Sequence, residues 1–193
     1  MAYSAKNYSH LLGLAGFSDT LLNNHFALYE GYVKNTNALS DKLKALTEKG
    51  ELSTPEFAEF KRRFGWEWNG MRMHELYFGN MTKESAPLAD GILKDKLATA
   101  YGSLENWEKN FVGTGAMRGI GWVVLAEDAE TGKLYNVWVN EHDLGHLVGT
   151  VPLLVMDVFE HAFMIDYGLR RADYIASFLK AIDWKVVEER LAA

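Results

Sequence analysis

Residues 151–167 read Val151-Pro-Leu-Leu-Val-Met-Asp157-Val-Phe-Glu160-His161-Ala-Phe-Met-Ile-Asp-Tyr167. The apolar run 151–156 predicts a buried strand, because its proline stands next to the start, where the loss of one N–H donor is tolerated. Asp157 and His161 follow the strand, one helical turn apart. A carboxylate and an imidazole held rigidly there can form half of a metal site. The residues alone favour a different interpretation, in which Asp157 caps the next turn and His161 is a half-buried structural histidine.

The composition limits the classes of protein to consider. The chain has 193 residues, 48% hydrophobic and 13% aromatic, which is enough for a folded core. It has no cysteine, which excludes disulfides and thiolate ligands, so a metal would need histidine and carboxylate. A net charge of −6 argues against nucleic acid and anionic membranes as partners. With no span-length apolar run and no signal-peptide pattern at the start, we expect a cytoplasmic protein.

The pattern of helices and strands predicts an α+β protein. An N-terminal antiparallel helical hairpin is expected in residues 1–84, and a domain with a three-stranded antiparallel sheet and flanking helices in residues 85–193. The expected helices cover about 20–39, 54–79, 88–102, 104–116, 171–180 and 183–191, and the expected strands 121–126, 133–139 and 151–156. Residues 40–50 are expected to be either a short amphipathic helix or a helix end. Ser18 and Thr54 are the expected N-caps of the first and third helices.

The motif Asp157-Val-Phe-Glu-His161-Ala resembles the Asp-x-Trp-Glu-His-Ala signature of the iron/manganese superoxide dismutase family. In that family the aspartate and the histidine both bind the metal. The resemblance implies two more ligand histidines on separate N-terminal helices, and His25 and His74 fit those positions. His74 is followed three and four residues later by two aromatic residues, as in the family.

The resemblance also implies residues that surround the metal. Tyr29 and Tyr32 match the substrate gate, although Tyr29 stands where histidine is commoner and Tyr32 lies one residue closer to the ligand than in many members. His142 matches the residue that reaches the solvent molecule on the metal. Gly70 matches a position that leaves space for a side chain from another part of the chain. His146 is expected to be an ordinary loop histidine.

The resemblance implies an enzyme that disproportionates superoxide to oxygen and hydrogen peroxide by redox cycling of one Fe or Mn ion. It also implies a homodimer, with a tetramer left open, in which Glu160 bridges to the partner subunit's His161. The choice between Fe and Mn stays open, because the combination of Gly70 and His142 occurs in members of both preferences.

The residues argue against three other classes of protein. A catalytically inactive relative that only binds metal or serves a structural role is disfavoured, because all four ligand positions are kept. A zinc hydrolase would need a carboxylate base beside the open site, where the flanking aromatic residues supply none. A di-iron carboxylate bundle needs paired Glu-x-x-His motifs, but the residues three before the four core histidines are Leu22, Met71, Val139 and Val158.

Overall fold

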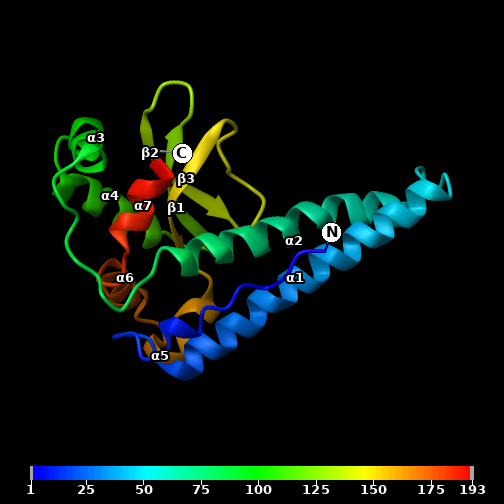
Figure 1. Cartoon of the computed structure of the whole chain (residues 1–193), viewed down its shortest axis with the longest axis horizontal. Coiled ribbons are helices and arrows are strands. Elements are labelled where there is room, and N and C mark those ends of the chain that lie inside the picture. Colours follow the sequence, from blue (N-terminus) through cyan, green and yellow to red (C-terminus); the bar gives the residue numbers. More distant parts are fainter. Residues whose placement is uncertain (1, 192–193) are drawn as a thin grey trace.

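The computed structural model describes residues 2–191. Its N-terminal part is an antiparallel pair of long helices, α1 (Asp19–Glu48) and α2 (Pro55–Gly79), which projects from the rest of the molecule (Figure 1). Ser18 accepts a hydrogen bond from the backbone N–H of Leu21, and Thr54 accepts one from Phe57, which confirms both expected N-caps.

Helix α1 runs unbroken from Asp19 to Glu48, so the residues after Leu39 continue the first helix and do not form a separate short one. Ser40-Asp41 has the composition of an N-cap, but the chain stays helical through it. Leu39, Leu43 and Leu46 are all buried and continue one helical stripe across that point. Packing against α2 therefore overrides the local capping preference.

The rest of the chain builds a sheet and its covering helices. The elements are α3 (Ile92–Tyr101), α4 (Leu104–Gly115), β1 (Gly121–Asp128), β2 (Leu134–Asn140), β3 (Thr150–Asp157), α5 (Met164–Tyr167), α6 (Arg171–Leu179) and α7 (Trp184–Leu191), with 3-10 turns η1 (Ser9–Leu11) and η2 (Glu160–Ala162). The expected three-stranded antiparallel sheet is confirmed, in the order β2-β1-β3. Helix α3 begins four residues later than expected, after Gly91.

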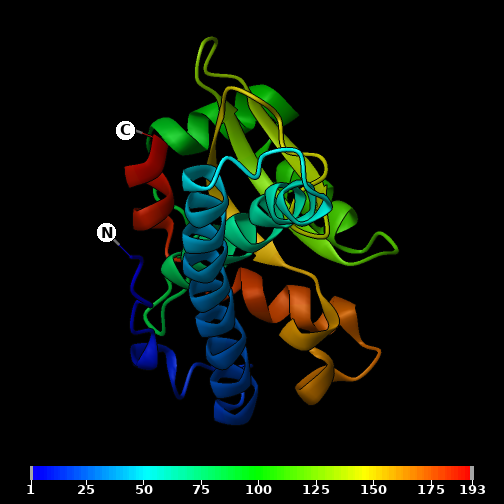
Figure 2. The same cartoon turned by 90° about the vertical axis from the view of Figure 1, so that its right-hand side faces the viewer.

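The site is set up where the two halves of the fold touch. Helix α2 packs against β3, and α1 contacts both η2 and α5. Seen from the side of the hairpin tip, α5 lies beside α1 (Figure 2). Trp122 of β1 pairs with Asp157 of β3, so the two side chains leave the same face of the sheet. Within residues 2–191, no helix has the length and apolarity that a membrane crossing requires.

Candidate metal centre

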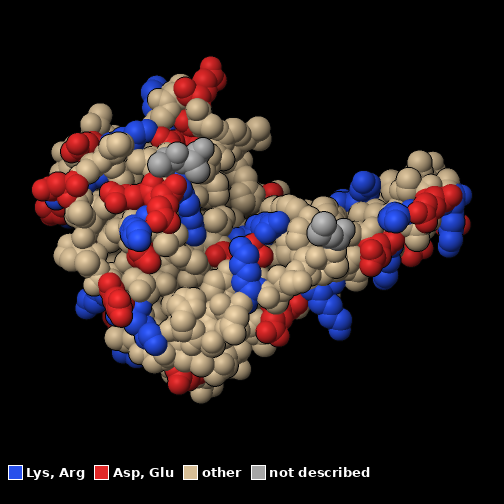
Figure 3. Space-filling view, viewed as in Figure 1, with Lys and Arg blue, Asp and Glu red and all other residues tan. Residues whose placement is uncertain are grey.

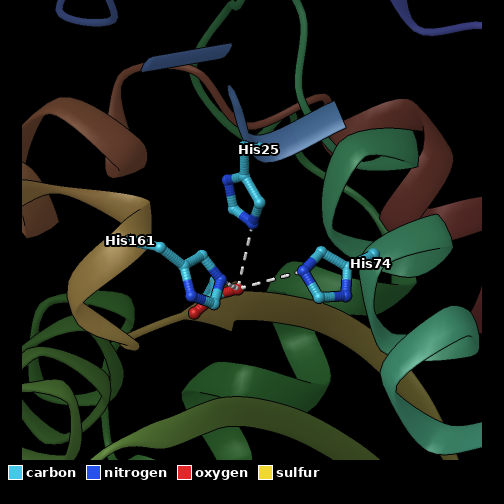
Figure 4. Close-up of side chains that lie close together, drawn as sticks. His25, His74 and His161 are labelled. Carbon is cyan, nitrogen blue, oxygen red and sulfur yellow. Dashed lines mark hydrogen bonds and ion pairs between the residues drawn. The ribbon is translucent and has the colours of Figure 1, made fainter. Parts of the chain in front are cut away.

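Four side chains from four elements converge on one point. His25 comes from α1, His74 from α2, Asp157 from the end of β3 and His161 from η2. One possible ligand atom of each lies within 4.8 Å of the other three. Asp157 Oδ2 is 3.2 Å from His25 Nε2, 3.7 Å from His74 Nε2 and 3.3 Å from His161 Nε2. Figure 4 shows the three imidazoles directed at this carboxylate oxygen. The structure thus brings together all four ligands expected from the sequence.

Backbone and side-chain hydrogen bonds hold these ligands in place. His74 Nδ1 donates to the carbonyl of Gly70 at 2.6 Å, which leaves Nε2 without a proton in the neutral ring. Asp157 Oδ1 accepts from the backbone N–H of Phe159 at 2.8 Å. The hydroxyl of Tyr174 donates to the backbone carbonyl of Asp157 at 2.5 Å. Supporting bonds of this kind fix ligand orientation in metal sites.

Two of the ring nitrogens that face the centre lack a hydrogen-bond partner. Among the described residues, Nε2 of His74 and Nε2 of His161 are buried and make no hydrogen bond. A buried polar atom left unpaired costs about 1–3 kcal/mol. A metal ion would satisfy both nitrogens, and three imidazoles with one carboxylate are a donor set that suits Fe or Mn. The residues present therefore fit one such ion.

The protonation states also suit metal binding. Burial lowers the pKa of His25, and lowers that of His74 still further, so both rings are neutral and keep a lone pair. Burial alone would raise the pKa of Asp157, but His161 and His25 outweigh it and hold the pKa well below its usual range. The centre is accordingly one carboxylate anion surrounded by imidazoles.

His142 is held beside the centre by two hydrogen bonds. Glu141, just before it, has a left-handed φ of 51°, and this turn brings His142 back over the end of the sheet. Trp122 Nε1 donates to His142 Nδ1 at 3.0 Å. Because indole is only a donor, the His142 proton lies on Nε2, which donates to the Tyr32 hydroxyl at 2.8 Å. Burial lowers the pKa of His142 to about 4.

Tyr32 fills the space beside Gly70. A Cβ added to Gly70 would lie 2.5 Å from a ring carbon of Tyr32, so any side chain there would displace the tyrosine. The side chain that occupies this space is thus Tyr32, and His142 meets it from the sheet side. Tyr32 also stacks on His74, with 5.1 Å between ring centroids. Burial raises the pKa of Tyr32 to about 12, so its hydroxyl stays protonated at neutral pH.

Tyr29, by contrast, directs its hydroxyl away from the Tyr32–His142 pair. Its hydroxyl donates to Glu75 Oε1 at 3.2 Å and accepts from the backbone N–H of Lys6 at 3.0 Å. The ring itself is buried, with its centroid 6.4 Å from that of His74. In the single chain Tyr29 therefore packs behind a ligand and does not join the hydrogen-bonded pair.

Several residues that shape the centre were missed by sequence reasoning. Trp122 fixes the tautomer of His142, and Tyr174 holds the backbone of Asp157. His146, expected to be an ordinary loop histidine, bonds the carbonyl of His142 at 2.9 Å. The pairing of Trp122 with Asp157 follows from strand register, which the sequence predicted only coarsely.

The fold and the site together define an α+β protein in which three histidines and one aspartate are placed to hold a single metal ion. A family model described as iron/manganese superoxide dismutases, C-terminal domain, matches residues 89–190. The iron superoxide dismutase of Aquifex pyrophilus is 35% identical over 182 residues, which cover 92% of this chain and 85% of the relative. The manganese superoxide dismutase 2 of Haloferax volcanii is 34% identical over 160 residues, covering 83% and 79%. The chain belongs to the iron/manganese superoxide dismutase family.

Proposed function

We propose that this chain is a superoxide dismutase, which converts two superoxide anions and two protons to oxygen and hydrogen peroxide. The single observation that carries the proposal is the convergence of His25, His74, Asp157 and His161, whose ligand atoms lie within 4.8 Å of one another. Family membership supports the same activity, because relatives named as iron and as manganese enzymes both match most of the chain. These four residues would hold one Fe or Mn ion.

The chemistry divides between the ion and the chain. When bound, a redox-active ion supplies the one-electron exchange that oxidises one superoxide and reduces the next. The single carboxylate of Asp157 cancels only part of a di- or trivalent ion's charge, and the remaining positive charge attracts an anion despite the net charge of −6. The buried aromatic rings around the ligands exclude water from the centre, which strengthens this attraction.

The Tyr32–His142 pair is the proposed proton donor to the substrate. Because His142 Nε2 donates to the Tyr32 oxygen, the hydroxyl proton of Tyr32 is free to point elsewhere. A pKa of about 12 keeps this proton on Tyr32 until a more basic species, such as reduced superoxide, takes it. Tyr32 is only partly buried, so solvent can return the proton. Tyr29 is the other proposed gate residue, acting through its packing against His74.

The proposed assembly is a homodimer formed around α5. Met164, Ile165 and Leu169 are exposed apolar residues on and next to this helix, and Leu169 is 92% exposed. The part of the molecule around α5 carries few charged side chains in the view of Figure 3. Glu160 is exposed next to His161, where it is available to a partner subunit. Replacing Glu160 with alanine should weaken the dimer or lower metal content, and unchanged sedimentation with full metal content would contradict this role.

Two further proposals concern the domain boundaries and the cellular location. Residues 1–84 and 85–193 are proposed as the two domains, supported by the match of the family's C-terminal domain to residues 89–190. The cytoplasm is the proposed location, in keeping with the absence of cysteine from the sequence. The inactive alternative gains no support from the site, since all four ligand side chains converge.

The decisive experiment is reconstitution of the metal-free protein with Fe and with Mn separately. We expect about one ion per chain and rapid consumption of superoxide with at least one of the two metals. Asp157→Asn should bind less metal, because the buried charge that balances the ion is lost. Asp128→Asn, which changes a half-buried carboxylate at the other end of β1 from Trp122, should bind as wild type. Fully loaded wild-type protein that does not consume superoxide would overturn the proposal.

A further inference from the structure

A charged pair lies on α2 just outside the Tyr32–His142 pair. Arg63 Nε donates to Glu67 Oε1 at 2.8 Å. The side chain of Glu67 is 4% exposed, while that of Arg63 is 50% exposed. The other carboxylate oxygen of Glu67 accepts from Asn35 of α1 at 3.2 Å. The carboxylate is thus fixed between the two helices, with the guanidinium on its solvent side.

Helical spacing places this pair one turn from the proton donor. Asn35 follows Tyr32 by three residues, and Glu67 precedes Gly70 by three. Since Tyr32 contacts Gly70, the Asn35–Glu67 contact lies about 4.5 Å further along the hairpin. A chain of aromatic contacts leads to the same point.

Trp66 supplies that aromatic connection between the charged pair and the centre. The guanidinium of Arg63 lies over the Trp66 ring at 5.0 Å. The Trp66 ring meets the His142 ring edge to face, with 4.8 Å between centroids. The two charges also reach Tyr32: Glu67 raises the pKa of its hydroxyl and Arg63 lowers it, after the larger effects of burial and Asp157.

We propose that Arg63 is a steering residue for the anionic substrate: it masks the buried carboxylate of Glu67 and presents a positive charge at the entrance beside Tyr32. The inference rests on the proposed function. Without Arg63, Glu67 would be a buried carboxylate with no cation beside it, one turn from Tyr32, in surroundings that screen its charge poorly. Such a charge repels superoxide where the local field matters most.

The test compares two arginines that differ in position and not in charge. Arg62, the neighbour of Arg63, makes a similar surface pair with Glu59 and its side chain is 72% exposed. Arg62→Gln and Arg63→Gln therefore lower the net charge of the protein equally. Two readouts are needed: kcat/KM for superoxide by pulse radiolysis over a range of ionic strength, and the Kd of azide, a small monovalent anion, from the visible absorption of the metal-loaded protein.

We expect Arg63→Gln to lower kcat/KM by about threefold to tenfold at low salt and to weaken azide binding. In wild type kcat/KM should fall as the salt concentration rises, and in Arg63→Gln this fall should disappear or become a rise. Arg62→Gln should stay within about twofold of wild type in both readouts. The double variant Arg63→Gln with Glu67→Gln should recover much of both losses, because the unmasked carboxylate is gone. Simple damage to the fold would not be repaired by a second substitution.

Equal effects of Arg62→Gln and Arg63→Gln would overturn the inference, because they would show that only net charge matters. A double variant no better than Arg63→Gln would also overturn it, because the carboxylate would then play no part. An inert wild type fully loaded with metal would refute the proposed function, and azide affinity would still decide whether Arg63 attracts anions to this entrance.

Discussion

At the scale of single residues, the orientation of His142 depends on one indole. Trp122 Nε1 donates to His142 Nδ1, so the imidazole proton is placed on Nε2, toward Tyr32. Both residues are fully buried, so water cannot replace the bond. The direction of the hydrogen bond between His142 and Tyr32 is therefore determined by Trp122 of strand β1 and does not require a metal ion.

Trp122→Phe should release this control. The ring would still fill the core, but a buried acceptor would lose its donor, at a cost of about 1–3 kcal/mol in the free energy of unfolding. We expect slower proton delivery, seen as a lower kcat with little change in metal content. Trp107→Phe, which removes a buried indole bonded to Asn136 at a distant site, is the matched control. Equal kcat for the two variants would contradict the role of Trp122.

Buried histidines should make the metal-free protein sensitive to acid. The pKa of His142 is lowered from 6.5 to about 4, mainly by burial, so its neutral ring contributes stability above pH 6.5 that is lost as the pH falls toward 4. This difference corresponds to about 3 kcal/mol. His25 and His74 add losses of the same sign, because burial lowers their pKa values too.

Chemical denaturation of the metal-free protein between pH 7 and pH 4.5 measures this loss. His142→Gln should show a shallower fall than wild type, by up to about 1.4 kcal/mol per pH unit, the value for one proton. His10→Gln, which replaces an exposed histidine, is the control variant. Identical slopes for all three proteins would show that His142 takes up no proton on unfolding in this range.

At the scale of secondary-structure elements, the start of α1 is tied to α5. Ser18 caps α1 through Leu21, and its hydroxyl also donates to Asp166 Oδ1 at 2.6 Å. Thr54 caps α2 through Phe57 and makes its other hydrogen bond within the adjoining turn. One cap therefore joins distant parts of the chain, while the other acts only locally.

Ser18→Ala should consequently destabilise the protein more than Thr54→Ala. Loss of a cap alone costs about 1 kcal/mol, and loss of the bond to the charged Asp166 adds about 1 kcal/mol more. Urea denaturation of the two variants and wild type, compared at one pH and in one metal state, gives the difference. A larger loss for Thr54→Ala would mean that the link to Asp166 contributes nothing.

Local signals and long-range packing account for what could and could not be predicted at this scale. The local signals of Thr54-Pro55 and of the apolar run 151–156 are enough to specify a helix start and a buried strand. Helix α2 and strand β3 were therefore predicted nearly to the residue. Ser40-Asp41 shows the opposite, because its cap signal is overruled by leucines packed against another helix. The convergence of the four proposed ligands was predictable from motifs, but the orientation of the Tyr29 hydroxyl depends on Lys6 and Glu75, which no local pattern connects to it.

At the scale of the whole molecule, the centre joins the hairpin to the sheet domain. Two ligands come from α1 and α2, and the other two from β3 and η2. A bound ion therefore crosslinks the two parts in the native state only. Binding to the native state alone raises stability by RT ln(1 + [L]/Kd), about 4 kcal/mol when the ion is present at a thousand times Kd.

Removal of the metal should lower Tm and make the two parts unfold less cooperatively. Calorimetry of the loaded and metal-free protein tests this, with tryptophan fluorescence as a second probe. His74→Ala, which removes a ligand from α2, should show no gain in Tm from added metal. A variant whose Tm still rises with metal as wild type does would show that the crosslink does not depend on α2.

Strand β3 lies at the margin of the sheet, where unpaired peptide groups can recruit another chain and start a fibril. The carboxamide of Asn80 occupies this margin, since it bonds both the N–H and the C=O of Val155, at 2.9 and 3.2 Å. Arg190 blocks the next free carbonyl, that of Leu153, at 2.7 Å. A slip of the strand by one residue would turn Asp157 to the opposite face. Asn80 and Arg190 thus occupy peptide groups that a second chain could otherwise pair with, and the same hydrogen bonds fix the register of the strand that carries Asp157.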